Sequence, residues 1–527
     1  MATSDDNKIT RSAGVVSFYT FLSRILGLIR DMVIASLFGS SMAADAFFVA
    51  FRIPNLLRRL FAEGSLTISF IPIFTEYLNI KGREDAFNLA RIVLTLLSVI
   101  LAVISILGVI FSPWIVRIQA FGFGTSSIKY DLTVLLTRIT FPYIFLISIV
   151  AFFMGVLNSL RHFAAPAAAP IFLNLGIIGA AYFISPYCDQ PIVGIAIGVL
   201  IGGFMQICLQ IPWVIKEGIR LFPKWQLDHP ALKKMGLLMV PAIFGSAVYQ
   251  FNQFIGTLLA SFLEEGSISW LYYADRLVQF PLGIFAIAIS TAALPSLSTH
   301  IVKKDYKQYG DTLSYALSMV FFITLPSMVG LIVLGRPIIS IIFERGAFDA
   351  YCSLMTSQAL LFYSIGLWAF SGIRVIVSGF YAIQDTVTPV KVAVIALGTN
   401  LILSLVLMAP MKHSGLAFAL SLSSAVQFFL LILFLKKKVH VGNIKYVFVS
   451  GIKFAFAAAV MGLGVKYFNS KWLVMDSGLG LWILVIKLTT LIIIGLVIYF
   501  SVVKMLGCQE VTSIMNLFKA RKKGYKI

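Results

Sequence analysis

Long runs of uncharged apolar residues recur along the whole chain and constrain its fold more than any other feature. Two examples are residues 94–111 and 488–503. Runs of about 18 or more such residues are typical of helices that cross a membrane. Of the 527 residues, 59% are hydrophobic and only 12% are charged, and the mean hydropathy is +0.94. These values exclude a soluble enzyme, a secreted disulfide scaffold, a fibrous protein and a disordered chain.

The sequence predicts an all-α polytopic membrane protein with fourteen transmembrane helices. Several exceed 20 residues, which allows for tilt or for kinks at Pro54, Pro72, Pro142 and Pro281. The expected helices cover residues 14–37, 43–74, 89–114, 132–158, 165–184, 192–215, 236–262, 268–298, 310–334, 354–382, 388–409, 414–435, 446–466 and 480–503.

The basic residues predict how these helices are oriented. With both termini in the cytoplasm, 25 of the 42 Lys and Arg residues lie in inside segments and seven in outside loops. Cytoplasmic loops of membrane proteins carry such an excess of Lys and Arg. The net charge of +20 is therefore explained by the membrane, and a nucleic-acid partner is not expected.

Proline, glycine and arginine residues recur at a spacing of about 224, which predicts an internal duplication. The paired positions are Pro113 and Pro337, Gly122 and Gly346, Arg52 and Arg276, Gly155 and Gly379, and Pro166 and Pro389. The spacing carries the second helix onto the eighth, so the halves have the same orientation, as in parallel transporter repeats. We expect two pseudo-symmetric six-helix lobes around a central space.

The repeat divides the chain into six segments. They are a cytoplasmic N-terminal tail (1–12), an N-lobe (13–215), a basic cytoplasmic joint (216–235), a C-lobe (236–436), a pair of extra helices (437–506) and a basic cytoplasmic tail (507–527).

Charged residues inside the predicted spans point to an anionic substrate. The basic ones are Arg24, Arg30, Arg52, Arg58, Arg59, Arg138, Arg276, Arg374, Lys453 and Lys487, against the acids Asp31, Asp45, Glu63 and Asp275. A charge at mid-bilayer is penalised by roughly 2.5–3.5 kcal/mol, so several of these side chains must face a water-filled cavity. The guanidinium fork of arginine suits phosphate.

Some of these arginines have alternative partners in the sequence. Arg59 and Glu63 are spaced to neutralise each other on one helix face. Arg30 has Asp31 beside it, and it also lies where its side chain could extend to the outer interface. Arg24 and Arg58 have no acid at helical spacing, so we expect them in the cavity. We expect Arg138 and Arg374 to be structural, and the sequence assigns no role to Lys453 or Lys487.

No catalytic or metal-binding motif is apparent. There is no P-loop and no G-x-S-x-G, and the five histidines make no metal-ligand spacing. The four cysteines are irregularly spaced, as isolated thiols are. We therefore expect a transporter that is driven by a gradient or by the membrane potential, and not an enzyme.

The motifs of the first two helices resemble the MurJ (MviN-type) lipid II flippase family of the MOP exporter superfamily. They read SRILGLIRDMVIASLFG and AADAFFVAFRIPNLLRRLFAEGSLTISFIPIF. The segments YYADRLVQFPLGIFAIAISTAALPSLS and GFYAIQDTVTPVKVA match the same family.

The resemblance implies a flippase of the bacterial inner membrane that serves peptidoglycan synthesis, cell-wall biogenesis and cell shape. The substrate would be lipid II, the undecaprenyl-pyrophosphate-linked precursor, carried from the inner to the outer leaflet by alternating access. The extra helices would hold the lipid tail in a groove. Membrane lipids are the other expected partners, and a monomer is expected. The substrate-binding residues would be Arg24, Arg30, Asp45, Arg52, Arg58 and Arg276.

The sequence departs from the family pattern at one position, and the resemblance leaves ion coupling open. Gln279 stands where some members have Glu, one helix turn after Arg276. No cofactor is implied, and sodium coupling stays open, with Asn252 and Asp385 as polar residues near the region where some members bind sodium.

Four other functions compete with this interpretation. A related exporter of cationic drugs would need acids in the cavity, and an exporter of lipid-linked O-antigen units is a close alternative. A membrane enzyme acting on polyprenyl phosphates would need clustered Asp or His at one membrane face. A scaffold would leave the buried arginines without a ligand.

Overall fold

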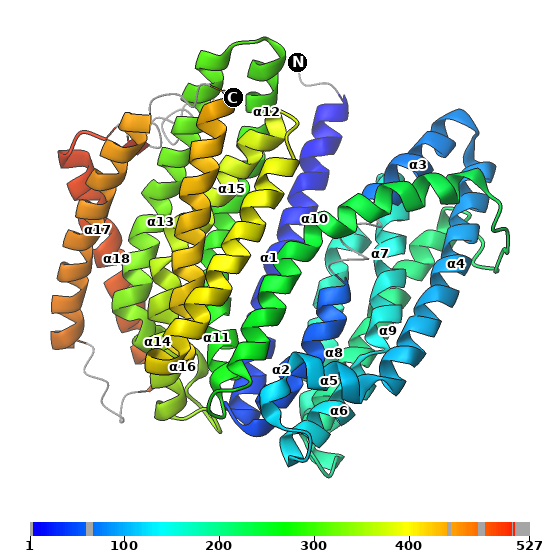
Figure 1. Ribbon diagram of the computed structural model, residues 1–527, viewed down its shortest axis with the longest axis horizontal. Helices are drawn as coiled ribbons and strands as arrows, with labels where there is room; N and C mark the ends of the chain where they lie inside the picture. Colours follow the sequence, from blue (N-terminus) through cyan, green and yellow to red (C-terminus); the bar gives the residue numbers. More distant parts are fainter. Residues whose placement is uncertain (1–3, 59–66, 440–443, 473–479, 509, 512–527) are drawn as a thin grey trace. The chain divides into compact units, whose positions relative to one another are not determined.

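A computed structural model of the chain (Figure 1) describes residues 4–58, 67–439, 444–472, 480–508 and 510–511. Within these residues the regular structure is helical, apart from one isolated bridge between Arg345 and Phe348. The predicted all-α membrane fold is confirmed. The chain divides into two compact units, Met1–Ser269 with Arg345–Phe348 (unit 1), and Trp270–Glu344 with Asp349–Ile527 (unit 2).

Unit 1 holds the helices of the first half of the chain and one more. They are α1 (Ser4–Phe38), α2 (Met42–Leu57), α3 (Thr67–Ile80), α4 (Arg83–Ile110), α5 (Ser112–Gln119), the short η2 (Phe121–Phe123), α6 (Ile128–Thr140), α7 (Tyr143–Ser159), α8 (Ala164–Phe183), the short η3 (Ser185–Tyr187), α9 (Ile192–Lys216) and α10 (Pro230–Ala260).

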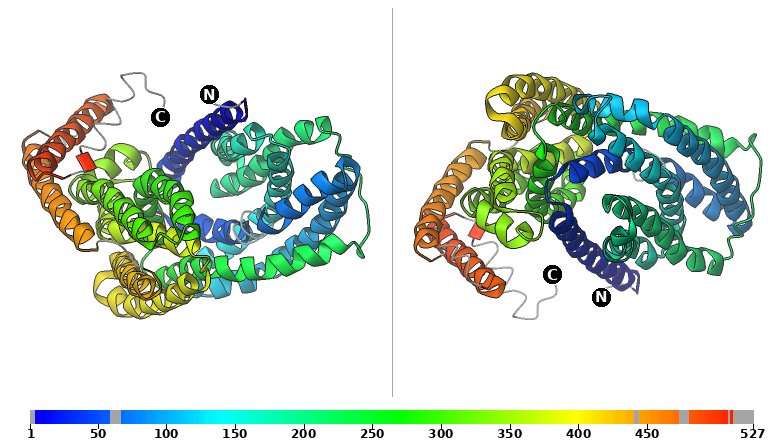
Figure 2. Two further views of the ribbon diagram at one scale, coloured as in Figure 1. Left: turned by 90° about the horizontal axis from the view of Figure 1, so that it is seen from above. Right: turned by 90° about the horizontal axis from the view of Figure 1, so that it is seen from below.

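The remaining helices form unit 2, except that residues 267–269 belong to unit 1. They are α11 (Ser267–Pro281), the π-helical turn η4 (Leu282–Ala286), α12 (Ile287–Val302), α13 (Tyr306–Phe343), α14 (Ala350–Ile365), α15 (Leu367–Ala382), α16 (Val387–Lys438), α17 (Ile444–Trp472) and α18 (Leu481–Met505). Helices α17 and α18 pack together at one edge of this unit, as both views of Figure 2 show.

The limit between the two units does not coincide with the predicted joint at residues 216–235. Helix α10, which the sequence places in the second lobe, packs against α3 and α5 and belongs to unit 1. The repeat describes sequence similarity, whereas the units describe packing. The segments derived from the repeat remain predictions.

Several predicted spans are broken in the ways that their sequences suggest. Pro281 is followed by the π-turn η4, and Pro142 separates α6 from α7. In α16 the non-helical Lys412 (φ 51°, ψ −132°) joins two helices, so this element contains the predicted spans 388–409 and 414–435. The predicted span 43–74 falls partly outside the described residues.

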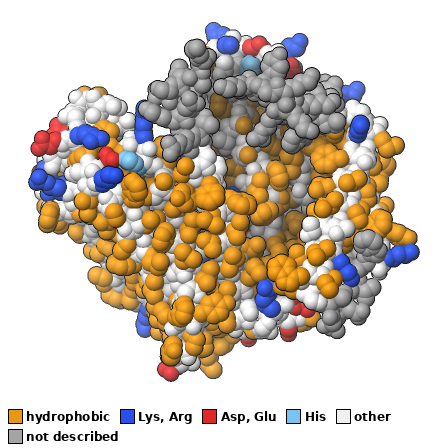
Figure 3. All heavy atoms as spheres, turned by 180° about the vertical axis from the view of Figure 1, so that it is seen from behind, with side chains coloured by type: hydrophobic (Ala, Val, Ile, Leu, Met, Phe, Trp, Pro, Cys, Tyr) orange, Lys and Arg blue, Asp and Glu red, His pale blue; other side chains and the backbone are white. Residues whose placement is uncertain are grey.

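In the described part of the chain, nine helices are long and apolar enough to cross a membrane, and the bent pair α14–α15 makes a tenth. The predicted count of fourteen is not confirmed by this test. The face drawn in Figure 3 is largely apolar, and its few charged side chains gather mostly toward the upper and lower edges. Such a band suits the hydrocarbon core of a bilayer.

Small residues bring α8 and α9 into close contact within unit 1. A Cβ on Gly176 would lie 2.5 Å from the Cα of Gly202, and a Cβ on Gly198 would lie 2.6 Å from the Cβ of Ala180. In membranes, where apolar burial between helices gives little drive, small residues at an interface allow close backbone approach.

We predict that Gly176→Leu destabilises unit 1, because its side chain would overlap the backbone of α9. Overpacking of this kind costs about 1–3 kcal/mol, which thermal unfolding in detergent would detect. Gly179→Leu is the matched control, since nothing lies within 4 Å of a Cβ at that position of the same helix. Equal unfolding temperatures for the two variants would contradict the packing argument.

Candidate functional site

Arg30 forms a buried network between α1 and α8. Its Nε and Nη2 donate to Asp31 Oδ1 (3.0 and 2.6 Å), and its Nη1 donates to Asn174 Oδ1 (3.2 Å). Asn174 in turn donates to the carbonyl of Ser23 (3.2 Å). Of the two partners considered for Arg30 in the sequence, the structure therefore shows the ion pair with Asp31. The side chains of Arg30 and Asp31 are only 10% and 2% exposed, so breaking this pair would leave a buried charge.

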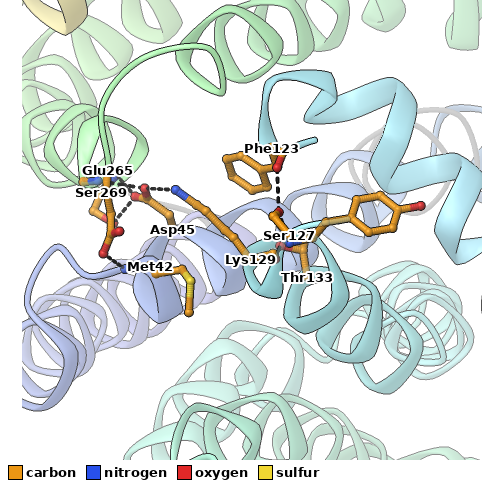
Figure 4. Close-up of polar contacts among 10 residues, drawn as sticks. Met42, Asp45, Phe123, Ser127, Lys129, Thr133, Glu265 and Ser269 are labelled. Atoms are coloured by element: carbon orange, nitrogen blue, oxygen red, sulfur yellow. Dashed lines mark hydrogen bonds and ion pairs between the residues drawn. The ribbon is translucent and has the colours of Figure 1, made fainter. Parts of the chain in front are cut away.

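Asp45, in the first turn of α2, is buried and accepts four hydrogen bonds. Its carboxylate accepts from Lys129 Nζ (2.8 Å), from the backbone N–H groups of Gly266 and Ser269 (2.9 Å each) and from Ser269 Oγ (2.6 Å), as Figure 4 shows. Because N–H groups at a helix start lack partners within the helix, Asp45 caps the beginning of α11.

The capping is reciprocal. The N-cap residue of α2, Ser41, makes no side-chain cap bond, and the N–H of Met42 donates instead to Glu265 Oε1 (2.5 Å) (Figure 4). Thus an acid beside each helix start serves the other helix. Asp45 and Ser269 are also 224 residues apart, the spacing of the predicted repeat.

Two further arginines lie on α2. Arg52 Nη1 donates to the carbonyl of Gln253 (3.1 Å) and to Thr257 Oγ1, which ties α2 to α10. Arg58 Nε donates to Asn55 Oδ1 (3.0 Å) on the same helix. Both arginines are half-buried. Arg59 and Glu63 lie outside the described residues.

Arg24 is exposed, whereas Arg276 is half-buried. Arg24 is exposed on α1, between the exposed apolar side chains of Phe21 and Ile25. Arg276, on α11 in unit 2, donates to the hydroxyl of Tyr272 (2.7 Å), and its guanidinium lies 4.8 Å from the centre of that ring. Such a cation–π contact attracts the guanidinium to the face of the tyrosine ring.

The neighbours of Arg276 explain the departure noted at Gln279. Gln279 Nε2 donates to Asp275 Oδ1 (3.3 Å), one turn away on the same helix. The neutral amide therefore engages the acid beside Arg276, whereas a glutamate at this position would repel it.

Arg30, Asp45 and Arg52 each belong to a network with a different helix, and sequence reasoning missed most of their partners. Lys129 lies between the predicted helices 89–114 and 132–158, and Asn174 lies within the predicted helix 165–184. Both lie far along the chain from the residues they bind, so no local pattern indicates them. Helical spacing could have indicated Asn55, three residues before Arg58, and Tyr272, four residues before Arg276.

Asp385, a polar residue near the region where some family members bind sodium, caps a helix. Its Oδ1 accepts from the N–H groups of Val387 (3.1 Å) and Thr388 (3.0 Å) at the start of α16, and its Oδ2 accepts from Lys438 Nζ (2.5 Å). Partial burial raises the pKa of Asp385, but the hydrogen bonds from Lys438 and Thr388 outweigh it and lower the pKa to about 2. Within the described residues no group of three or more His, Cys, Asp or Glu side chains is placed to hold a metal ion.

Comparison with known proteins identifies the family. The family model described as lipid II flippase MurJ matches residues 34–485. A probable lipid II flippase MurJ of Vibrio cholerae is 38% identical over 509 residues, which cover 95% of this chain and 96% of that protein. The chain belongs to the lipid II flippase MurJ family. The predicted membership is thereby confirmed, and the family is one of transporters and not of enzymes.

Other relatives support the assignment to the lipid II flippase MurJ family. A lipid II flippase MurJ of Burkholderia cenocepacia is 39% identical over 432 residues, 81% of this chain and 84% of that protein. A solved lipid II flippase MurJ in an inward closed conformation has a TM-score of 0.79 at 29% identity, covering 93% of this chain and 98% of that one. An inward-facing multidrug resistance MATE transporter of the MOP superfamily has a TM-score of 0.67 at 14% identity, covering 81% and 98%, and shares the fold.

Membership of the lipid II flippase MurJ family, together with the apolar helices, makes this a multi-pass protein of the bacterial inner membrane. The coarser part of the predicted localisation is thus confirmed, while the orientation of the termini stays a prediction.

We predict that Asp45→Asn destabilises the protein, because it leaves the amine of Lys129, only 15% exposed, without its ion pair. Removing one partner of a buried pair costs about 3–5 kcal/mol. Thermal unfolding in detergent should show the loss, and Asp45→Asn with Lys129→Met should recover part of it. Unfolding at the temperature of the unchanged protein would contradict this role.

Asp385 generates a pH-dependent prediction. Its folded pKa lies below its ordinary value of 3.8, so the stabilisation is present above about pH 4 and is lost as the pH falls toward 2. Asp385→Asn should therefore unfold at a lower temperature than the unchanged protein near pH 7. The gap should close between pH 4 and 2, and a gap that is independent of pH would refute the assignment.

Proposed function

We propose that this chain flips lipid II, the undecaprenyl-pyrophosphate-linked peptidoglycan precursor, from the inner to the outer leaflet of the cytoplasmic membrane. The observation that carries the proposal is the match of the lipid II flippase MurJ family model to residues 34–485. The relatives named above, matched over nearly their whole length, support it. A carrier of this substrate must bind a diphosphate while its polyprenyl tail stays in lipid.

Arg24, Arg58 and Arg276 are the proposed diphosphate-binding residues. Arg24 is exposed on α1, so its guanidinium is accessible to water or to an anion in a hydrated cavity. Arg58 donates to the neutral amide of Asn55, and Arg276 donates to the neutral hydroxyl of Tyr272. Charge-assisted, bidentate hydrogen bonds from arginine to phosphate suit such groups.

Arg30, Asp45 and Arg52 contribute to the site by positioning its helices. Arg30 is bonded to Asp31, Asp45 to Lys129, and Arg52 to the side chain of Thr257. A guanidinium that is buried against a carboxylate is a weaker ligand for phosphate than one that is not, since it must first break that pair. Arg30 and Asp45 through their ion pairs, and Arg52 through its bonds to α10, hold α1 and α2 in place for Arg24 and Arg58.

Transport proceeds by alternating access, driven by the membrane potential or by an ion gradient. Proteins of this fold have been solved in inward-facing and outward-facing conformations, with TM-scores to this chain of 0.67 and 0.58. With the inside negative, each negative charge moved outward gains about 2.3 kcal/mol per 100 mV. The diphosphate therefore makes the outward step favourable.

The remaining assignments complete the proposal. The two lobes follow the repeat, both termini are cytoplasmic, the protein acts as a monomer and it binds no nucleic acid. Helices α17 and α18 provide the groove for the lipid tail, which is supported by exposed apolar side chains such as Phe456 and Ile493.

The test is Arg→Ala substitution at positions 24, 58 and 276, one at a time. Loss of a charge-assisted bond costs about 1.5–3 kcal/mol, so we expect at least about tenfold less lipid II in the outer leaflet of cells that carry only the variant. Arg→Lys should recover part of the activity, because it keeps the charge and loses the fork.

Arg117→Ala is the matched control, because Arg117 lies in the short helix α5, its guanidinium 5.9 Å from the centre of the Trp114 ring. Each variant's amount in the membrane must match that of the unchanged protein. Normal outer-leaflet lipid II in all three Arg→Ala variants would overturn the proposed site.

A further inference from the structure

The connection between α9 and α10 in unit 1 is an extended segment fastened along α4. It begins where Gly218, with a φ of +94°, ends the helical course of α9. Glu217 is ion-paired with Arg83 (3.4 Å), the carbonyl of Phe222 accepts from Arg91 Nε (3.1 Å), and the N–H of Lys224 donates to Thr95 Oγ1 (2.9 Å). Figure 1 shows this green connection beside α4.

The contacts with Arg83, Arg91 and Thr95 show how far the segment extends along α4. From Arg83 to Thr95 the helix rises about 18 Å. Arg91 is the last charged residue of α4, and the uncharged stretch from there to Ile110 is about 28 Å long, close to the thickness of a bilayer's hydrocarbon core. Thr95 lies one turn inside that stretch. Residues 222–225 are therefore at the border between headgroups and hydrocarbon.

The side chains at this depth suit such a border. Ile219 is buried (4% exposed), whereas Phe222, Trp225 and Leu227 are 74%, 61% and 54% exposed. Exposed aromatic rings gather at membrane interfaces, where one part of the side chain is apolar and another is wet. In water, three large apolar side chains exposed on one short segment would be unfavourable.

Basic groups surround these apolar side chains. Arg220 is exposed and Lys224 is half-buried. Of the nearby acids, Glu217 is paired with Arg83 and with His162 (2.6 Å), while Asp228 is exposed. Burial, and then the nearby charges of Lys81 and Lys224, lower the pKa of His229, against a smaller opposing effect of Asp85.

We propose that residues 219–227 form an interfacial strap, which embeds Phe222, Trp225 and Leu227 in the lipid interface and binds anionic phospholipid headgroups through Arg220 and Lys224. The charge distribution of the sequence places this end of unit 1 at the cytoplasmic leaflet. The proposal does not depend on which substrate the protein moves.

The geometry explains why this surface takes a lipid and not a second protein. The strap is fastened to the side of a membrane-crossing helix, at the depth of its first uncharged turn, so its outer face borders the bilayer. Each Lys or Arg close to an anionic membrane surface favours binding by about fivefold. Two such groups among embedded aromatic side chains make a headgroup site that prefers anionic over zwitterionic lipid.

The experiment uses Trp225 as a depth probe in the full-length protein. The protein is reconstituted in phosphatidylcholine bilayers in which bromine atoms are carried either by added phosphatidylglycerol or by the phosphatidylcholine. The fluorescence of Trp225 is the difference between the unchanged protein and Trp225→Phe. We expect quenching of this fluorescence by both lipids, and at least about threefold more efficient quenching by the anionic one at equal bromine content.

Arg220→Gln with Lys224→Gln should remove the anionic preference while the quenching itself remains. The matched control is Lys303→Gln with Lys304→Gln, an exposed basic pair between α12 and α13, which should leave the Trp225 signal unchanged. If Trp225→Phe does not fold, Phe222→Trp compared with Phe222→Leu supplies the same measurement. Absence of quenching by either lipid would overturn the strap, and equal quenching by both would overturn the headgroup site.

Discussion

A charge in an apolar membrane span needs a partner or water, and the structure of unit 1 depends on this constraint. Asp45 meets it with an ammonium group, two backbone N–H groups and one hydroxyl. Arg30 meets it with the carboxylate of Asp31 and the amide of Asn174. Each buried charge thereby fastens helices that are distant in sequence. Pairing satisfies the charge, and it also determines which helix ends meet.

The same constraint separates the basic residues into two kinds. Those with a buried partner, Arg30 among them, hold helices together, and removing one partner would leave the other charge stranded. The proposed function gives Arg24, which is exposed, and Arg276, which donates to a neutral hydroxyl, the other task of binding an anion. A flippase for a diphosphate-linked lipid needs both kinds, because a mobile substrate site must be built on helices whose own charges are already satisfied.

The bilayer imposes a related demand at its border. Basic residues beyond the last uncharged turn of α4 lie where phospholipid headgroups begin, and the strap at residues 219–227 brings aromatic side chains to the same level. A connection that only joined α9 to α10 would need neither the basic residues nor the aromatic side chains. Its fastening to Arg91 and Thr95 ties the connection to a membrane-crossing helix, so it stays at one depth.

The sequence by itself determined the helical membrane fold, the positions of most spans and several of their breaks, such as the turn after Pro281 and the interruption at Lys412. It also indicated the family and the candidate arginines. Hydropathy, proline and short motifs act over one or two helix turns, so a local window contains them. Only the tertiary structure decided that Lys129 pairs with Asp45, that Asn174 binds Arg30, and that α10 packs in unit 1. These partners are brought together by the packing of whole helices, which no local pattern encodes.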